Sequence, residues 1–205
     1  MEVLTRYALI FGVFFSFLSL NAQSELDNKE AFRKSYDAEF QLKYLKSIEE
    51  LNKVSDQSLY EVNLRMGWLH YKAGKYLESI SFYKKAIAKM PYSIEARLGI
   101  VYPLGTLDKW DNVIEHYKVI LKYDSGNPTA LYRLGLIHYN RTEYSLSWKF
   151  IQQYIHLYPF DFDGNSLAGW IKFSVGKKEE AFVFFKKALL INPYDASFNK
   201  VLGIK

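Results

Sequence analysis

The chain has 205 residues, of which 18% are aromatic, and 27 lysines and arginines stand against 22 acids, for a formal net charge of +5. This length holds one domain or a short array of repeats, and the aromatic content excludes a largely disordered protein. There is no cysteine, so disulfides, thiolate metal sites and thiol catalysis are excluded. The basic residues are dispersed along the chain, which indicates a solvated surface, and we expect no nucleic-acid partner.

The N-terminal segment has the pattern of a secretory signal peptide. Arg6 precedes an apolar run over residues 7–20, and the chain becomes polar at Glu25. The run is shorter than the roughly 20 residues that span a bilayer. We therefore predict a signal peptide over residues 1–22, cleaved after Ala22, and a mature chain with no stable membrane span in the bacterial periplasm or cell envelope. The alternative is an uncleaved segment that anchors the protein in the membrane.

Residue types recur along the chain with a period of 34. Four columns keep small, large and turn-forming residues apart, with a looser fifth column at Ala86, Ile120, Tyr154 and Ala188. The four are Gly67, Val101, Gly135, Gly169; Ser79, Val113, Ser147, Ala181; Tyr83, Tyr117, Ile151, Phe185; and Pro91, Ser125, Pro159, Pro193. Where two helices of a hairpin cross closely, one side must be nearly bare, so a small residue faces a large one. Proline closes each unit because it cannot continue a helix.

This pattern resembles the tetratricopeptide repeat. The resemblance implies an all-α fold, a solenoid of helical hairpins that winds into a right-handed superhelix. It places repeats at residues 60–93, 94–127, 128–161 and 162–195. The second and third repeats depart from the family pattern at Val101, Ile120, Ser125 and Tyr154, so we expect them to pack less regularly.

Both ends of the array are predicted to be atypical. Residues 44–48 (YLKSI) match residues 76–80 (YLESI) at four of five positions, which indicates a degenerate N-terminal repeat over residues 28–59 with Ser35 in the small column. Its charged sequence suits a terminal cap. Asp195 is a suitable N-cap for a closing helix over residues 196–204. The tetratricopeptide array would then occupy residues 23–205, with its closing helix in residues 196–205.

The repeat register also predicts the helices. First helices are expected over residues 59–73, 92–102, 128–141 and 162–175, and second helices over residues 76–89, 110–122, 144–157 and 178–191. Pro103 follows the second of the first helices. Because proline has no N–H and its ring crowds the carbonyl four residues back, we predict a shortened or kinked helix there. The alternative is a kink that widens a ligand groove.

Catalytic motifs are absent from the sequence. There is no Gly-rich phosphate loop, paired-histidine helix or nucleophile elbow. His70 and His138 share a column but lie two repeats apart, so we interpret them as structural residues. The Asp161 to Asn165 stretch lacks the closing glutamate of a calcium loop and is interpreted as a turn. We predict that the protein is not an enzyme and has no metal site and no cofactor.

The resemblance also implies a binding surface, because first helices of such repeats line a concave groove. The residues expected to face it are almost all aromatic, and they are Leu64, Trp68, Tyr71, Tyr102, Tyr132, Tyr139, Trp170 and Phe173. Exposed Trp and Tyr suit binding because they bring a large rigid area at small entropy cost. Some family members bind a peptide carboxylate with lysine and asparagine at the positions of Leu64 and Trp68, so that clamp is not expected here. The alternative is that several of these rings fill space between neighbouring first helices.

The leading hypothesis is an exported, non-catalytic scaffold that holds a protein or peptide of the cell envelope in an aromatic-lined concave groove. One alternative is a protein that binds an envelope glycan, since sugar rings stack on Trp and Tyr. Another is a structural protein that self-assembles into homo-oligomers through exposed aromatic residues. The sequence does not identify the partner.

Overall fold

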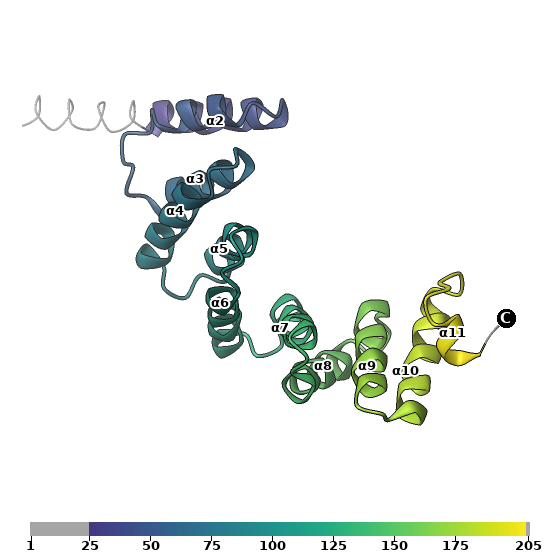
Figure 1. Cartoon of the computed structure of the whole chain (residues 1–205). Coiled ribbons are helices and arrows are strands. Elements are labelled where there is room, and N and C mark those ends of the chain that lie inside the picture. The colour runs from purple at the N-terminus through teal and green to yellow at the C-terminus, as the bar shows by residue number, and fades with distance from the viewer. Residues whose placement is uncertain (1–24, 204–205) are drawn as a thin grey trace, which may run out of the picture. The chain divides into compact units, whose positions relative to one another are not determined.

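A computed structural model describes residues 25–203, and every regular element in that range is a helix (Figure 1). Contacts divide the chain into two compact units, Met1–Trp110 and Asp111–Lys205, which are described separately below. The predicted signal peptide and its cleavage point after Ala22 lie outside the described residues. Within residues 25–203, no helix has both the length and the apolar composition needed to cross a bilayer.

The first unit is a row of packed helices. A helix over residues 25–40 is followed by α2 (Tyr44–Leu51), α3 (Tyr60–Lys72), α4 (Tyr76–Lys89) and α5 (Ile94–Thr106). In turn α2 packs on α3, α3 pairs with α4 as a hairpin, and α4 packs on α5 (Figure 1). Leu51, Val62, Met66 and Leu69 are fully or almost fully buried in its core.

The second unit continues the same pattern. Its helices are α6 (Trp110–Tyr123, whose first residue belongs to the first unit), α7 (Pro128–Asn140), α8 (Tyr144–Leu157), α9 (Phe162–Ser174), α10 (Lys178–Ile191) and α11 (Asn199–Leu202). Two pairs, α7 with α8 and α9 with α10, form hairpins, and α8 packs on α9. One core cluster forms around Ile151 and Ile171, and another around Phe185 and Phe198.

The small and large columns of the sequence face one another as expected. A Cβ atom added to Gly67 would lie 2.8 Å from the ring of Tyr83, and one added to Gly135 would overlap Ile151. The same substitution at Gly169 would overlap the ring of Phe185. The helices of each hairpin therefore approach so closely that only a residue without a side chain fits at the crossing.

The serine column has a specific structural role. Ser79 Oγ donates to the carbonyl of Gly67 at 2.6 Å, and Ser147 Oγ donates to the carbonyl of Gly135 at 2.7 Å. In the N-terminal hairpin, Ser47 Oγ donates to the carbonyl of Ser35 at 2.7 Å. All three serines are fully buried. The degenerate repeat therefore has the same crossing geometry as the regular ones, with Ser35 in the place of glycine.

The helix boundaries follow the predictions closely, with one correction at Pro103. The helices α4, α8 and α10 have the predicted limits, whereas α5 does not end at Tyr102 but continues through Pro103 to Thr106. Proline removes a single hydrogen bond, and the next turn is intact because Leu107 N bonds to the Pro103 carbonyl at 3.2 Å. Pro103 and Leu104 are buried, and this burial offsets part of the cost of proline in a helix, about 3 kcal/mol.

A second correction concerns the closing helix. Asp195 Oδ1 accepts a hydrogen bond from Ser197 N at 2.8 Å, which closes a turn, and the described helix α11 begins only at Asn199. Between them, the side chain of Phe198 is buried in the C-terminal core. The chain is therefore held here by an inserted ring, and the helix predicted from residue 196 is wrong in its first turn.

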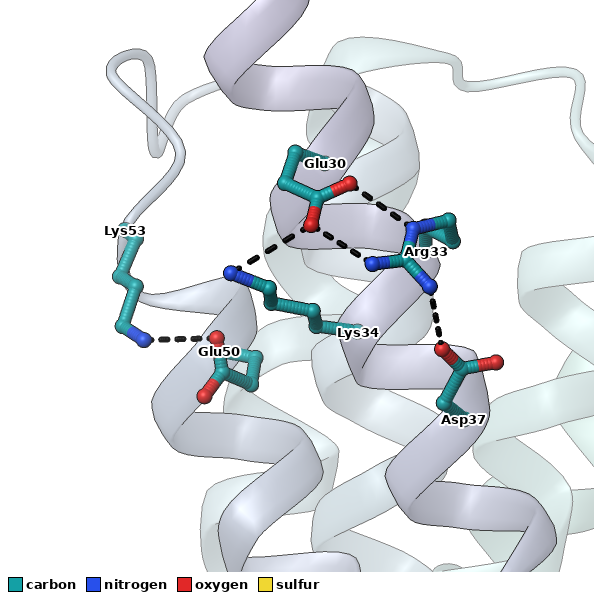
Figure 2. A network of polar contacts seen from close by, with 6 residues as sticks. All are labelled: Glu30, Arg33, Lys34, Asp37, Glu50 and Lys53. Atoms are coloured by element: carbon teal, nitrogen blue, oxygen red, sulfur yellow. Dashed lines mark hydrogen bonds and ion pairs between the residues drawn. The ribbon is translucent and has the colours of Figure 1, made fainter.

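Charged side chains cover the outer face of the N-terminal hairpin. Figure 2 shows Glu30 between Arg33 and Lys34, with contacts of 2.7 and 3.4 Å, and Asp37 against Arg33 at 2.8 Å. The hydrogen bond from Arg33 lowers the pKa of Glu30 to about 2. Exposed pairs of this kind contribute little to stability, but they keep the face hydrated, as the end of a repeat array requires.

Candidate binding groove

A groove of about 950 Å³ lies in the first unit, near the upper end of the range for ligand sites. Three roughly consecutive first helices line it, and one second-helix residue, Tyr83 of α4, also contributes. Its lining comes from the helix over residues 25–40 (Phe32, Tyr36), from α3 (Tyr60, Glu61, Leu64, Arg65, Trp68) and from α5 (Ile94, Glu95, Leu98, Gly99, Tyr102).

The three predicted contact residues of this unit gather at one end of the groove. Trp68 and Tyr102 both line it, with ring centroids 6.5 Å apart in an edge arrangement. Tyr71 lies beside them, 5.9 Å from Trp68 and 5.7 Å from Tyr102. Tyr102 is 54% exposed, so this aromatic cluster offers ring surface to a ligand.

A polar network fixes one wall of the groove. The indole Nε1 of Trp68 donates to Glu39 Oε1 at 2.5 Å, and Arg65 donates to the other carboxylate oxygen at 2.7 Å. The guanidinium of Arg65 also lies over the ring of Tyr36, 3.7 Å from its centroid. Because the side chains of Arg65 and Glu39 are only 13% and 22% exposed, the pair holds its geometry in partly desolvated surroundings.

Tyr83 forms part of the groove by reaching between two first helices. Its ring lies against Gly67 of α3, and a Cβ atom on Gly99 of α5 would overlap it. Burial raises the pKa of the Tyr83 phenol well above its usual range. The two glycines thus let one ring from α4 join α3 to α5 and fix the width of the groove at this point.

Two carboxylates lie at the opposite end from the aromatic cluster. Glu61 and Glu95 stand in the first turns of α3 and α5, and both are exposed. The hydroxyl of Tyr60 lies between the helices, 2.7 Å from Ser93 Oγ and 3.3 Å from Glu95 Oε2. Burial, together with the nearby Glu95 charge, raises the pKa of Tyr60.

In the second unit the predicted aromatics pack mainly against other aromatics. Tyr132 lies 5.6 Å from Tyr154, and Tyr139 lies 5.7 Å from Tyr144, in both cases between ring centroids. Tyr132 and Tyr139 are half-buried against the core cluster around Ile151. Burial raises the pKa of Tyr132. These contacts are those of rings that fill space between helices.

Trp170 and Phe173 belong to the C-terminal core. The ring of Trp170 lies 4.9 Å from Phe185, 6.0 Å from Phe198 and 6.0 Å from Phe173. Beside them, Lys172 bonds to Glu180 at 2.7 Å and lies over Trp148, 3.7 Å from the ring centroid. The structure therefore brings Trp68, Tyr71 and Tyr102 together as a surface cluster, and it gives Trp170 a packing role.

Four groove residues were missed by the sequence reasoning: Phe32, Tyr36, Arg65 and, behind Trp68, Glu39. A signal for three of them was present. The offset of 32 residues that relates the degenerate repeat to the next one places Phe32 on Leu64, Tyr36 on Trp68 and Glu39 on Tyr71. Extending the groove-facing columns by that offset identifies the N-terminal hairpin as a wall of the groove.

The histidines take structural positions within their own hairpins. His70 stacks on Phe82 with centroids 4.9 Å apart, and His138 stacks on Phe150 at 5.7 Å. His138 Nδ1 also forms a very short contact with Glu143. Within residues 25–203, no three His, Cys, Asp or Glu side chains gather in a way that would hold a metal ion.

Comparison with protein families identifies the repeats. The family model described as tetratricopeptide repeat matches residues 60–88 in the first unit and residues 164–195 in the second. The chain contains tetratricopeptide repeats. Among curated proteins, a TPR repeat-containing protein of Methanocaldococcus jannaschii is 28% identical over 194 residues, which cover 84% of this chain and 32% of that protein. The chain thus spans about a third of the length of the curated relatives it matches.

Solved structures confirm the fold class. A crystal structure of MamA protein aligns with a TM-score of 0.72 at 20% identity and covers 84% of this chain and 95% of that one. A tetratricopeptide repeat protein from Parabacteroides merdae aligns with a TM-score of 0.76 at 16% identity, covering 87% and 75% of the two chains. The protein is an all-α solenoid of helical hairpins, as predicted. The fold is that of protein-interaction scaffolds, and these comparisons indicate no enzyme family.

Proposed function

We propose that the protein is an exported, non-catalytic scaffold that holds a segment of a partner protein of the cell envelope in the groove of its first unit. The observation that carries this proposal is the groove itself, in which Trp68 and Tyr102 present ring surface beside Leu64 and Leu98. Tryptophan and tyrosine dominate the energetics of protein interfaces because they bring a large, rigid, partly polar area.

Preorganisation supports a binding role for this wall of the groove. Trp68 is held by Glu39, and Glu39 is in turn held by Arg65. A ring whose orientation is already fixed loses little entropy when a partner covers it. The wall opposite α5 comes from the N-terminal hairpin, so the proposal gives the degenerate repeat a role in binding as well as in capping.

Photo-crosslinking tests the groove directly. A photoreactive amino acid placed at Leu98, inside the groove, should form a discrete adduct with an envelope protein in the native cell. The same group at Leu190, which is 73% exposed on α10, serves as the matched position outside the groove and should not form this adduct. Cell fractionation of the same cultures tests export, which predicts that the mature chain is in the envelope fraction.

Ring removal then assigns the adduct to the aromatic cluster. The double variant Trp68→Ala/Tyr102→Ala should lose the Leu98 adduct while its helical content stays unchanged. Trp110→Ala is the control, because Trp110 is 42% exposed and does not line the groove. An adduct that persists in the double variant would contradict the groove as the binding site. A Leu98 adduct of twice the mass of this chain would instead support self-assembly.

A further inference from the structure

We propose that the groove recognises a peptide segment that carries a cationic side chain about three residues away from an apolar one. This inference rests on the proposed function and names the chemistry of its partner. It is drawn from the charge balance of the lining and from the distance between its acidic and aromatic ends.

The acidic end consists of two repeat-equivalent carboxylates. Glu61 and Glu95 are separated by one period of 34 residues and take the same place in the first turns of α3 and α5. Both are exposed and both line the groove. Glu61 forms no ion pair with a described residue, and Glu95 accepts a hydrogen bond from Tyr60. Two like charges on neighbouring helices attract a cation to the space between them.

The positive charge that lines the groove is already neutralised. Arg65 is bound to Glu39 through a contact of 2.7 Å and lies over Tyr36. The lining therefore carries a net negative charge from Glu61 and Glu95, although the whole chain has a formal charge of +5. An acidic segment would bring like charges together, and a basic one would relieve them.

Aromatic faces strengthen the preference for a cation. Within the protein, Arg65 already lies 3.7 Å from the centroid of Tyr36, and Lys72 lies 5.3 Å from that of Trp68. Rings of this kind attract ammonium and guanidinium groups through their negative faces. Tyr60 stands beside both glutamates in the lining, so a ligand cation would meet carboxylates and a ring together.

The length of the groove sets the spacing in the ligand. Trp68 and Tyr102 each follow the glutamate on their own helix by seven residues, a distance of roughly 10 Å at 1.5 Å per residue. An extended polyproline-like peptide rises about 3.1 Å per residue and returns to the same face every third residue, after about 9 Å. A cation and an apolar side chain three positions apart therefore reach both ends of the groove at once.

Three blocked peptides of one length test the charge preference by calorimetry with the full mature chain. Each carries phenylalanine three positions after the test residue, which is arginine, glutamine or glutamate, with alanine and glycine elsewhere. We expect the arginine peptide to bind about 5-fold or more tightly than the glutamine peptide, since each exposed charge pair contributes about 0.2–1 kcal/mol. The preference should weaken between low and high salt, because exposed charges are screened.

Charge-removal variants locate the effect. In Glu61→Gln/Glu95→Gln the arginine and glutamine peptides should bind within about 2-fold of each other. Glu78→Gln/Glu179→Gln is the matched control, because these two exposed glutamates also lie in first turns, of α4 and α10, but outside the groove. It should keep the preference for arginine. Tighter binding of the glutamate peptide, or an unchanged preference in Glu61→Gln/Glu95→Gln, would overturn the inference.

Ring removal separates this inference from the proposed function. If the three peptides bind equally and Trp68→Ala/Tyr102→Ala abolishes binding, the groove is a peptide site without charge selection, and only the inference fails. If none of the peptides binds at millimolar concentration, or if binding survives in the ring variant, the proposed function fails with it.

Discussion

The indole of Trp68 donates its hydrogen to the carboxylate of Glu39, 29 residues earlier in the chain, at 2.5 Å. The same carboxylate receives Arg65 at 2.7 Å, so one side chain of the N-terminal helix orients two residues of α3. Trp68 is therefore not a free ring on a helix surface. Its position depends on a hairpin that retains little of the repeat pattern.

Glu39→Ala is expected to weaken both the fold of the first unit and its groove. Removing the acceptor leaves the mostly buried guanidinium of Arg65 without its partner, which costs about 1–3 kcal/mol. The urea midpoint of the mature chain should fall, and ligand binding should fall with it. Asp37→Ala is the control, because Asp37 is 57% exposed and pairs with an exposed Arg33, so its effect should stay below about 0.5 kcal/mol. Equal effects of the two changes would contradict the role of Glu39.

The crossing in α7 and α8 predicts a large cost for a single methyl group. In Gly135→Ala the new Cβ would overlap Ile151, which is fully buried, so we expect a loss of about 1–3 kcal/mol from overpacking. Gly105→Ala adds the same methyl group to α5, where the nearest atoms belong to Trp110 at 3.7 Å. There the change should be neutral or add up to about 1 kcal/mol of helix stability. A thermal melt of the two variants decides whether packing or helix propensity governs these glycines.

The repeat period predicted most of the fold because it reports the packing of neighbouring helices. Gly67 and Tyr83, or Gly169 and Phe185, recur at fixed spacing since each pair must meet at a crossing, and this fixes the register of both helices. Serines of the next column were predicted only as small residues. Their hydrogen bonds to carbonyls twelve residues earlier also explain why alanine does not replace them throughout.

The features that the period did not predict involve residues outside its frame. Phe198 lies beyond the last repeat, yet it packs on Trp170 and Phe185 and helps draw the tryptophan into the core. Glu39 belongs to the degenerate repeat, whose offset is 32 and whose function therefore could not be carried over from the regular columns. Asn63 and Asn165 are a third case, because each donates to two carbonyls of the preceding turn, a role that neither period nor hydropathy indicates.

The hairpin turns contain a strained position that can be relieved. Thr142 has φ 59°, whereas glycine occupies the equivalent place in two other repeats, Gly74 with φ 76° and Gly176 with φ 80°. A β-branched residue in the left-handed region costs about 1–2 kcal/mol, and glycine regains part of this as unfolded-state entropy. Thr142→Gly should therefore stabilise the protein by roughly 0.5–1 kcal/mol in a thermal melt. Gly176→Thr is the reciprocal change and should lower the melting temperature. A lower melting temperature for Thr142→Gly would show that Thr142 makes a contact worth more than the strain.

Stability should also fall as the pH drops through the range in which histidine titrates, because of His70. Burial, followed by the positive charge of Lys75, lowers the pKa of His70 below its usual value, and Glu78 opposes this only weakly. Its buried Nδ1 has no hydrogen-bond partner among the described residues, and the ring stacks on Phe82. The unfolded chain thus binds a proton at a higher pH than the folded one. The full stability is present above about pH 6.5, and it declines between the unfolded and the folded pKa of His70.

His70→Leu isolates this contribution, because Leu104 occupies the same column in the next repeat and is buried there. Urea midpoints of both proteins should be measured at pH 7.5 and pH 5.5. The wild-type protein is expected to lose more stability over this interval than His70→Leu, while His138 and the other histidines contribute equally to both. If the two proteins lose the same amount, the buried ring of His70 is not the group that titrates, and the low-pH destabilisation must come from another residue.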